Sequence, residues 1–140
     1  MEVTEAEADL FAKHYTRLSY KPSRMGDWLP FSNEFSATEI HKFLIFDDDK
    51  LIAASYLDIL VHSTNSICGI FEPGLEKRSL GIFTILKEIE YSLAIGKKFY
   101  YIGYSCEEKS TFDYKKRFHG LERYDWNGNW VPYPRLLGDL

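Results

Sequence analysis

Two segments of the chain carry apolar side chains at helical spacing, and we expect both to form helices. Residues 4–18 place their apolar and aromatic side chains on one face, with Thr4 suited to the N-cap and Glu7 to completing a capping box. Residues 79–95 show the clearer pattern, because a serine suits the N-cap and Gly96 suits the position after the last turn. The apolar stripe predicted for this second helix consists of Ile82, Ile85, Leu86, Ile89 and Leu93.

Segments rich in β-branched and aromatic residues predict strands. Residues 38–46 and 50–60 predict a hairpin around the acidic turn 47–49, because aspartate side chains readily hydrogen-bond to a turn backbone. The second of these strands reads LIAASYLDIL, which is mostly apolar and typical of a strand covered on both faces. Two further strands are expected over residues 65–71 and 98–104.

The order of these elements predicts the fold. A strand, a helix and a strand in succession through 65–104 favour a parallel pair with a right-handed crossover, and the flanking hairpins favour antiparallel neighbours. Residues 21–35 are expected to form a long loop anchored by aromatic residues. We predict an α/β, GNAT-like (acyltransferase-like) fold, with a mixed, mostly antiparallel sheet and helices on both faces. We expect it to form a single domain over residues 1–140.

The last third of the chain predicts two smaller elements. A short helix is expected over about 110–119. Asn127 and Gly128, between two aromatic segments, are the signal of a hairpin with a type I′ turn. Pro132 confines the last strand to the edge of a sheet, since proline cannot donate a hydrogen bond to a neighbouring strand.

Composition and charge narrow the classes of function. With 45% hydrophobic residues the chain is typical of a globular protein, and no apolar run approaches the ~18 residues of a membrane span. The 2 cysteines and 4 histidines show no metal-binding spacing. Residues 1–65 carry 6 Lys/Arg against 11 Asp/Glu, and residues 66–140 carry 11 against 10, which gives the net charge of −4. A strongly basic, non-specific nucleic-acid binder is therefore excluded, and any RNA contact must be local. We expect no metal, no membrane contact and a cytoplasmic location.

The segment FEPGLEKRSLG (71–81) carries the strongest signal of a site, because it leads from a strand into a helix N-terminus. The first amides of a helix have no internal acceptor, and together with the helix dipole they favour phosphate binding. Lys77 and Arg78 lie directly before the helix, and Gly81 permits close approach to its backbone. The alternative interpretation is an ordinary capped helix that follows a basic loop.

Residues 78–81 (RSLG) also match the first part of the motif with which GNAT acetyltransferases bind the pyrophosphate of coenzyme A. Phe83 stands where that motif has a small residue, and its bulk would hinder the approach of a pyrophosphate to the backbone. The departure argues against ordinary use of acetyl-CoA.

Six segments share their order and spacing with a known family. They are LIAASYLDIL (51–60), Ser66 with IFEP (70–73), SLGIFTILKEIE (79–90), KKFYYIGYS (97–105), DYKKRFHGLE (113–122) and WVPY (130–133). Together they resemble the C-terminal catalytic domain of arginyl-tRNA–protein transferases and their bacterial leucyl relatives, over about residues 8–133.

This resemblance implies transfer of an amino acid from the 3′ end of an aminoacyl-tRNA to the N-terminal amine of a protein or peptide. The donor is then an ester beside RNA phosphates, and no cofactor is needed. The family's cysteine-rich N-terminal region has no counterpart here, so no iron–sulfur cluster is expected. The stretch SCEEKST (105–111) and Asp113 depart from the family on the expected acceptor side, and acceptor specificity is not carried over.

The donor is expected to contact the start of the second helix. Ser79, Leu80 and Gly81 would contact its terminal phosphate or ribose, while Lys77 and Arg78 would attract the RNA end.

Five further residues are expected on the reaction and acceptor side. Tyr104, at the end of its strand, would face the reacting ester, and Asp58 would receive or orient the acceptor amine. Tyr114 and Lys115 match the family's YK pair, for orientation or acid/base chemistry and for pairing with phosphate or an acidic acceptor. Phe71 is expected to contact substrate. In the alternative interpretation Asp58 caps a turn and Tyr114 only packs its helix against the sheet.

Two other functions fit the same residues. The first is a coenzyme-A-dependent N-acetyltransferase. The second is a non-catalytic binding module that holds a tRNA end, a peptide N-terminus or a partner protein.

Overall fold

The protein is described here by a computed structural model that covers residues 2–18, 25, 29 and 38–134. The chain forms two units, residues 1–103 and 104–140. The expected single domain over residues 1–140 stays a prediction. The loop expected over 21–35 lies outside the described residues, apart from the buried Met25 and Leu29.

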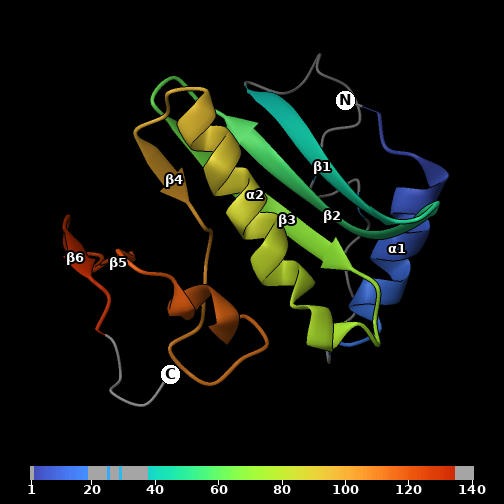
Figure 1. The fold of residues 1–140 in the computed structure, drawn as a ribbon. Coiled ribbons are helices and arrows are strands. Elements are labelled where there is room, and N and C mark those ends of the chain that lie inside the picture. Colours follow the sequence, from blue (N-terminus) through green and yellow to red (C-terminus); the bar gives the residue numbers. More distant parts are fainter. Residues whose placement is uncertain (1, 19–24, 26–28, 30–37, 135–140) are drawn as a thin grey trace. The chain divides into compact units, whose positions relative to one another are not determined.

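The first unit is built on a four-stranded sheet in the order β1-β2-β3-β4 (Figure 1). Strands β1 (Glu39–Asp47), β2 (Lys50–Ile59) and β3 (Ser63–Phe71) are antiparallel neighbours. Strand β4 (Phe99–Tyr101) pairs in parallel with β3, after the crossover through helix α2. The mixed, mostly antiparallel sheet expected from the sequence is confirmed.

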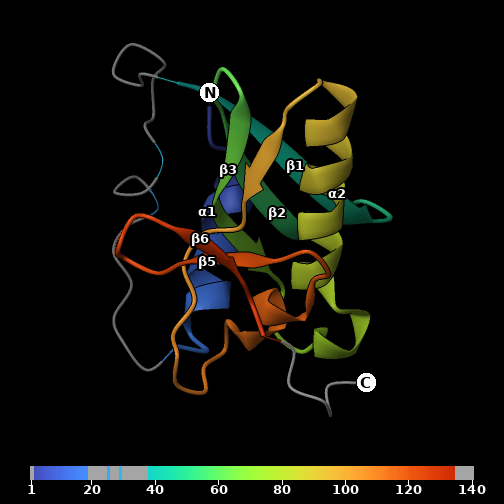
Figure 2. The same ribbon diagram turned by 90° about the vertical axis from the view of Figure 1, so that its left-hand side faces the viewer.

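Helices α1 (Glu5–Tyr15) and α2 (Leu80–Ala94) lie on opposite faces of this sheet, as Figures 1 and 2 show from two sides. Residues 52–57 of β2 are all buried, because the strand is covered by a helix on each face. The predicted α/β architecture with helices on both faces is confirmed, and it is consistent with the GNAT-like fold.

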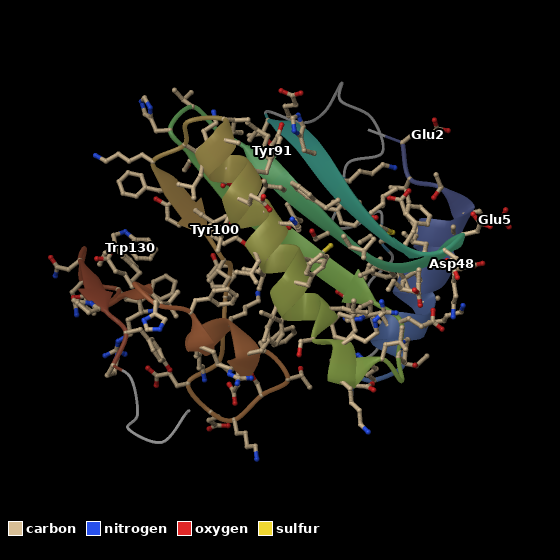
Figure 3. The ribbon with its side chains drawn as sticks, in the orientation of Figure 1. Glu2, Glu5, Asp48, Tyr91, Tyr100 and Trp130 are labelled. Atoms are coloured by element: carbon tan, nitrogen blue, oxygen red, sulfur yellow. The ribbon has the colours of Figure 1, made fainter. Side chains whose placement is uncertain are left out.

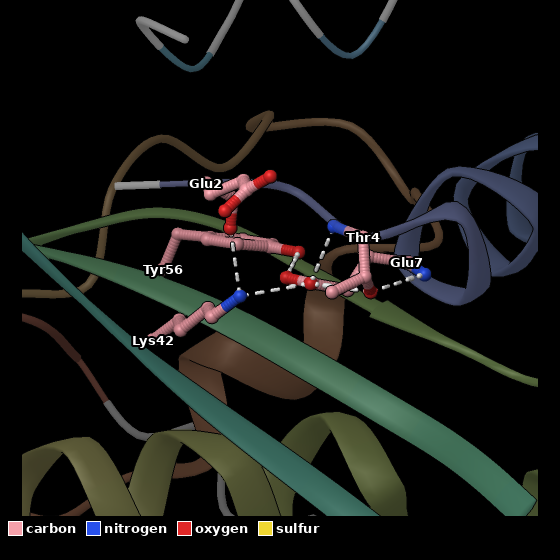
Figure 4. A network of polar contacts seen from close by, with 5 residues as sticks. All are labelled: Glu2, Thr4, Glu7, Lys42 and Tyr56. Carbon is pink, nitrogen blue, oxygen red and sulfur yellow. Dashed lines mark hydrogen bonds and ion pairs between the residues drawn. The ribbon is translucent and has the colours of Figure 1, made fainter. Parts of the chain in front are cut away.

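The start of α1 is fixed by the predicted capping box. The Glu7 amide donates to Thr4 Oγ1 (3.3 Å), and the Thr4 amide donates to Glu7 Oε2 (2.9 Å). The Glu7 carboxylate is fully buried and also accepts hydrogen bonds from Tyr56 Oη (2.7 Å) and Lys42 Nζ (2.9 Å), as Figure 4 shows. Burial raises the pKa of Glu7, but the bonds from Lys42, Thr4 and Tyr56 outweigh burial and hold the pKa below its usual value.

The apolar stripe predicted for α2 is wrong in part. Leu86 and Leu93 are exposed, and the face turned toward the sheet carries polar residues one turn apart. Ser92 hydrogen-bonds to Thr64 of β3 at 2.7 Å, and Tyr100 of β4 donates to Glu88 at 2.6 Å. Polar side chains are tolerated under the helix because hydrogen bonds to the sheet offset their loss of water. The buried members of this face are Leu80, Thr84, Ile85, Glu88 and Ser92.

The second unit contains the 3-10 helix η4 (Asp113–Arg117) and a separate two-stranded antiparallel sheet of β5 (Glu122–Tyr124) and β6 (Trp130–Pro132). The helix predicted over 110–119 is thus shorter and tighter, since the Asp113 carboxylate binds the Ser110 amide (3.1 Å) and closes the turn locally. None of the described residues from 104 to 134 is buried.

The predicted type I′ turn at Asn127 and Gly128 is wrong, although the hairpin itself is present. A type I′ turn needs positive φ at both of its central residues, whereas here positive φ falls on Trp126 (61°) and Gly128 (100°). The connection spans residues 125–129, closed by a bond of 3.0 Å from the Asp125 amide to the Asn129 carbonyl. The Asp125 carboxylate selects this longer loop because it accepts the amides of Asn127 (2.8 Å) and Asn129 (3.0 Å).

Candidate functional site

Strands β3 and β4 separate early, which opens the edge of the sheet. They pair over only three residues each, Ser63–Asn65 with Phe99–Tyr101, although β3 continues to Phe71. Among the described residues of the first unit, none pairs with the outer edge of β3 from Ser66 onward. Backbone amides on such an edge are able to bind an oxyanion or a substrate carbonyl.

The open edge of β3 leads directly into residues 71–81, the segment expected to bind the donor, which we call the donor segment. After Phe71 the chain forms the 3-10 helix η3 (Glu76–Arg78) and then enters α2 at Ser79. Ser79 occupies the N-cap position, as predicted, with a left-handed backbone (φ 51°, ψ 41°). Its hydroxyl makes no capping hydrogen bond, so the predicted use of the side chain as a cap is wrong.

Two amides at the start of α2 have no hydrogen-bond acceptor among the residues that the structure describes. Ile82 and Phe83 both donate to the Ser79 carbonyl, at 3.0 Å each, whereas Leu80 and Gly81 make no such bond. The Leu80 side chain is buried in the core, so only its backbone can meet a ligand. The helix dipole and these two amides favour an anion at this point.

The two basic residues before α2 differ in their surroundings. Arg78 Nη1 donates to Asp47 Oδ2, at the end of β1, at 2.7 Å. Both side chains of this pair are about half exposed, so the pair contributes on the order of 0.2–1 kcal/mol and is easily exchanged. Lys77 is exposed and forms no ion pair with any other described residue. Both cations therefore remain accessible to a phosphate.

Phe71 is held from the side of α1. The Arg17 guanidinium lies 4.3 Å from the centre of its ring, and the His14 ring meets it edge-on at 4.5 Å. His14 Nδ1 lies 3.0 Å from the Phe71 amide nitrogen. Burial lowers the pKa of His14 to about 4, with a further contribution from the Arg17 charge, so the imidazole is neutral near pH 7. These contacts fix the end of β3, from which the donor segment starts.

Asp58 lies at the other end of the sheet from the donor segment. It pairs in register with Asn65 of β3, and its carboxylate accepts a hydrogen bond from Thr38 Oγ1 at 2.7 Å. From Asn65 to Phe71, β3 extends about 20 Å at ~3.3 Å per residue. Asp58 does, however, share its row of the sheet with Asn65 and Tyr101, the last pair before β3 and β4 separate. The structure thus places Asp58 beside the start of the opening and does not bring it to the helix N-terminus.

The three remaining predicted residues belong to the second unit. Lys115 Nζ lies 3.4 Å from the Tyr104 carbonyl oxygen and 5.6 Å from the centre of the Phe112 ring. The structure therefore brings Tyr104 and Lys115 together, and Tyr114 adjoins Lys115 on η4. The Tyr104 side chain is exposed.

The sequence analysis missed one polar contact in the first unit that adjoins the opening. Glu88, fully buried on α2, accepts a hydrogen bond from the hydroxyl of Tyr100, which is labelled in Figure 3. Tyr100 pairs with Thr64, where β3 and β4 still run together. The signal was present in the sequence, because Glu88 lies four residues from Thr84 and from Ser92, on one face of an otherwise apolar helix.

Comparison with known proteins supplies the family context of this site. Residues 6–125 match the family described as "Arginine-tRNA-protein transferase, C terminus". An aspartate/glutamate leucyltransferase of Acinetobacter baylyi is 30% identical over 141 residues, covering 96% of this chain and 52% of the relative. The protein of the same name from Stenotrophomonas maltophilia is 30% identical (89% and 55% covered), and that of Aeromonas hydrophila is 31% identical (79% and 46%). The chain spans about half the length of the curated relatives it matches.

Proposed function

Since the chain belongs to the arginine-tRNA-protein transferase C-terminus family, we propose that it transfers an amino acid from an aminoacyl-tRNA to the N-terminal amine of a protein or peptide. The observation that carries the proposal is the family match over residues 6–125, which includes the donor segment and the separation of β3 from β4. The relatives are named aspartate/glutamate leucyltransferases, which is consistent with the transfer of an amino acid.

The donor end of the reaction suits the start of α2. The amides of Leu80 and Gly81 favour a phosphate or ribose oxygen, and Lys77 and Arg78 supply positive charge beside them. To bind phosphate, Arg78 exchanges its contact with Asp47, at a small cost for an exposed pair. The aminoacyl ester would then extend along the open edge of β3.

The reaction itself is the aminolysis of an ester. A neutral amine attacks the carbonyl carbon, a C–N bond forms, and the C–O bond to the ribose breaks. The amine loses a proton and the ribose oxygen gains one. Amides on the free edge of β3 would hold the oxyanion of the tetrahedral intermediate, and positioning would supply much of the rate acceleration, up to ~7–11 kcal/mol in well-organised cases.

Side chains of both units have roles in this proposal. Asp58 would orient the acceptor amine beside the start of the opening. Tyr104 and Tyr114 would orient the ester or exchange protons, and Lys115 would meet a phosphate or an acidic acceptor. Phe71 would contact substrate with the exposed part of its ring. No cofactor enters the reaction, because the ester already carries the energy of transfer.

The proposed donor indicates where the reaction takes place. Among the described residues, no helix is long and apolar enough to cross a membrane. The proposed donor, charged tRNA, is a cytoplasmic substrate, and we place the protein there.

The test is an isotope-transfer assay with the purified chain. Labelled aminoacyl-tRNA is offered with peptides that differ in their N-terminal residue, and labelled acetyl-CoA is offered in a parallel reaction. Transfer from tRNA to an amine is the expected result, and the label identifies the amino acid. Transfer from acetyl-CoA alone would overturn the proposal in favour of an N-acetyltransferase. The observations that support this alternative are the RSLG match (78–81) and the Leu80 and Gly81 amides, which have no acceptor among the described residues. No transfer from either donor, with tRNA still bound, would indicate a binding module.

A further inference from the structure

Three aromatic side chains gather at the tip of the β5–β6 hairpin. Tyr124 ends β5, Trp130 begins β6 directly opposite, and Trp126 lies in the connecting loop. Their exposed fractions are 38% for Tyr124, 50% for Trp130 and 77% for Trp126, which is unusual for tryptophan. We name these three residues the hairpin ring cluster; Figure 3 labels Trp130 within it.

The rings of this cluster do not stack on one another. The Tyr124 and Trp126 ring centres are 5.5 Å apart with planes at 80°, and those of Tyr124 and Trp130 are 5.5 Å apart with planes at 51°. Trp126 is the most exposed of the three and meets Tyr124 edge-on, a geometry that does not cover the faces of its ring, whereas parallel stacking on Tyr124 would cover one of them. Open, rigidly placed ring faces are what a flat ligand needs.

The loop that presents Trp126 is held firmly in an uncommon conformation. A φ of 61° is rare for a bulky side chain and is sterically unfavourable. The Asp125 carboxylate offsets this cost by accepting the Asn127 amide, the Asn129 amide and the Asn129 side-chain nitrogen (3.0 Å). The tip is thus built to present its rings, since a type I′ turn would have required none of this.

Charges and edge chemistry of the same unit restrict what binds there. Helix η4 carries three consecutive cations, Lys115, Lys116 and Arg117, and Lys116 is near enough to Tyr133, just after β6, for the two to interact electrostatically. Asp113 pairs with Lys116 at 2.8 Å, whereas Arg117 has no ion pair with any residue in the described part of the chain. Pro132 in β6 disfavours a protein strand added to this edge. Exposed rings and cations within one unit are the combination that single-stranded nucleic acid uses.

We infer that the hairpin ring cluster stacks the unpaired nucleobases of single-stranded RNA, with the η4 cations on its phosphates. This inference rests on the proposed function for the source of that RNA, the 3′ end of the charged tRNA. It adds a second contact to the donor, distinct from the helix N-terminus of the first unit.

The experiment measures binding of the full chain to a fluorescently labelled single-stranded RNA that ends in CCA. Trp126→Gly removes the ring and suits the left-handed φ, so thermal stability should not fall. Loss of one stacked base corresponds to about 1–3 kcal/mol, so we expect binding about five- to a hundredfold weaker. Trp130→Ala should weaken binding similarly, and Trp126→Phe, which keeps a ring, should weaken it least. Phe46→Ala is the matched control, because Phe46 is 54% exposed on the first unit.

Two results would overturn the inference. One is unchanged RNA affinity in both Trp126→Gly and Trp130→Ala, with both variants folded. The other is a cluster that serves self-association, seen as a dimer in sedimentation that Trp126→Gly dissociates without any change in RNA affinity. Failure of the proposed function is distinguishable: RNA binding that depends on Trp126, in a chain that transfers nothing, would leave the stacking site standing and remove the transferase. Transfer with a KM for charged tRNA that Trp126→Gly leaves unaltered would do the reverse.

Discussion

The two units of this chain are stabilised in different ways. The first buries a core between a four-stranded sheet and two helices, and even its charged Glu7 is enclosed there. The second buries none of its described residues and relies on carboxylates that bind their own loops, Asp113 to Ser110 and Asp125 to Asn127 and Asn129. Burial contributes roughly 25 cal/mol per Å² of apolar surface, while exposed polar contacts each contribute little.

This difference matches two requirements of the proposed transfer reaction. A phosphate site made of backbone amides must be rigid, and the site proposed at the start of α2 adjoins the core of the first unit, in which Leu80 is buried. Side chains that meet varied substrates gain from exposure, and none of those proposed for this role in the second unit is buried, namely Tyr104, Lys115 and the hairpin ring cluster. The following predictions test the division, from the largest effect to the smallest.

The largest effect is expected where the first unit encloses charge. Glu7→Ala would leave Tyr56 Oη buried without its acceptor and Lys42 without its anion. Breaking a buried ion pair is strongly destabilising, but the Lys42 side chain is 26% exposed and can turn to water. We therefore expect a loss at the lower end for such pairs, about 3 kcal/mol of unfolding free energy. Urea unfolding measures it. Glu5→Ala, on the exposed side of the same first turn, is the control and should cost well under half of that.

A second test uses pH to weaken the junction of α1 and β3. The pKa of His14 is about 4 in the folded chain against 6.5 for the free side chain, so folding favours the neutral imidazole. This contribution is fully present above pH 6.5 and is lost as the pH falls toward 4. The difference between these two pKa values corresponds to at most about 3 kcal/mol of unfolding free energy, because partial solvation of the imidazole reduces the effect. His14→Gln, which does not titrate, should flatten the fall in unfolding free energy between pH 6.5 and 4; an equally steep fall in this variant would assign the effect to other groups.

The sequence predicted the first unit better than the second, and the reason is physical. Periodicity reports burial, so β1, β2, β3 and α2 were found close to their limits. Where burial is absent, local hydrogen bonds decide, and these are weakly encoded: Asp125 replaced the expected turn, and the helix of 110–119 shrank to Asp113–Arg117. The prediction of the apolar stripe on α2 was wrong in part for a different reason. Glu88 is buried because Tyr100, twelve residues later, donates to it, and no local pattern contains that contact.

The site residues were also predicted with unequal success. The position of the donor segment between β3 and α2 was predicted correctly, because it follows from a strand and a helix in succession along the chain. Asp58 was expected at the reaction centre, and register shows it beside Asn65, at the far end of β3 from the donor segment. The register of a strand depends on its pairing with a neighbouring strand, and the pattern of one sequence did not specify which residues pair.

A third prediction concerns the exposed ion pair of Arg78 and Asp47 beside the proposed donor site, where we expect an effect of intermediate size. Arg78→Glu should weaken binding of charged tRNA and reduce the slope of log affinity against log salt by about one, since one phosphate contact is lost. Asp47→Asn should have the opposite effect, because it releases Arg78 from its 2.7 Å ion pair. Lys98→Glu, an exposed charge reversal at the other end of α2, is the matched control. Equal losses in Arg78→Glu and Lys98→Glu would show a general charge effect and remove the donor site from this position.

The smallest effect on overall stability should come from the carboxylate that organises the second unit. Asp125→Ala removes three hydrogen bonds from the hairpin tip, but the tip is exposed, so the urea midpoint of the first unit should not move. Amide exchange at Asn127 and Asn129 should instead become faster, because both amides donate to that carboxylate. The Asn129 side chain and the two amides hold the pKa of Asp125 below its usual value of 3.8, so the tip should stay ordered at pH 5 and loosen only as the pH falls through that lowered pKa. If exchange stayed slow in Asp125→Ala, the tip would be held by contacts other than the carboxylate. If the midpoint of the first unit fell with it, the two units would not be stabilised separately.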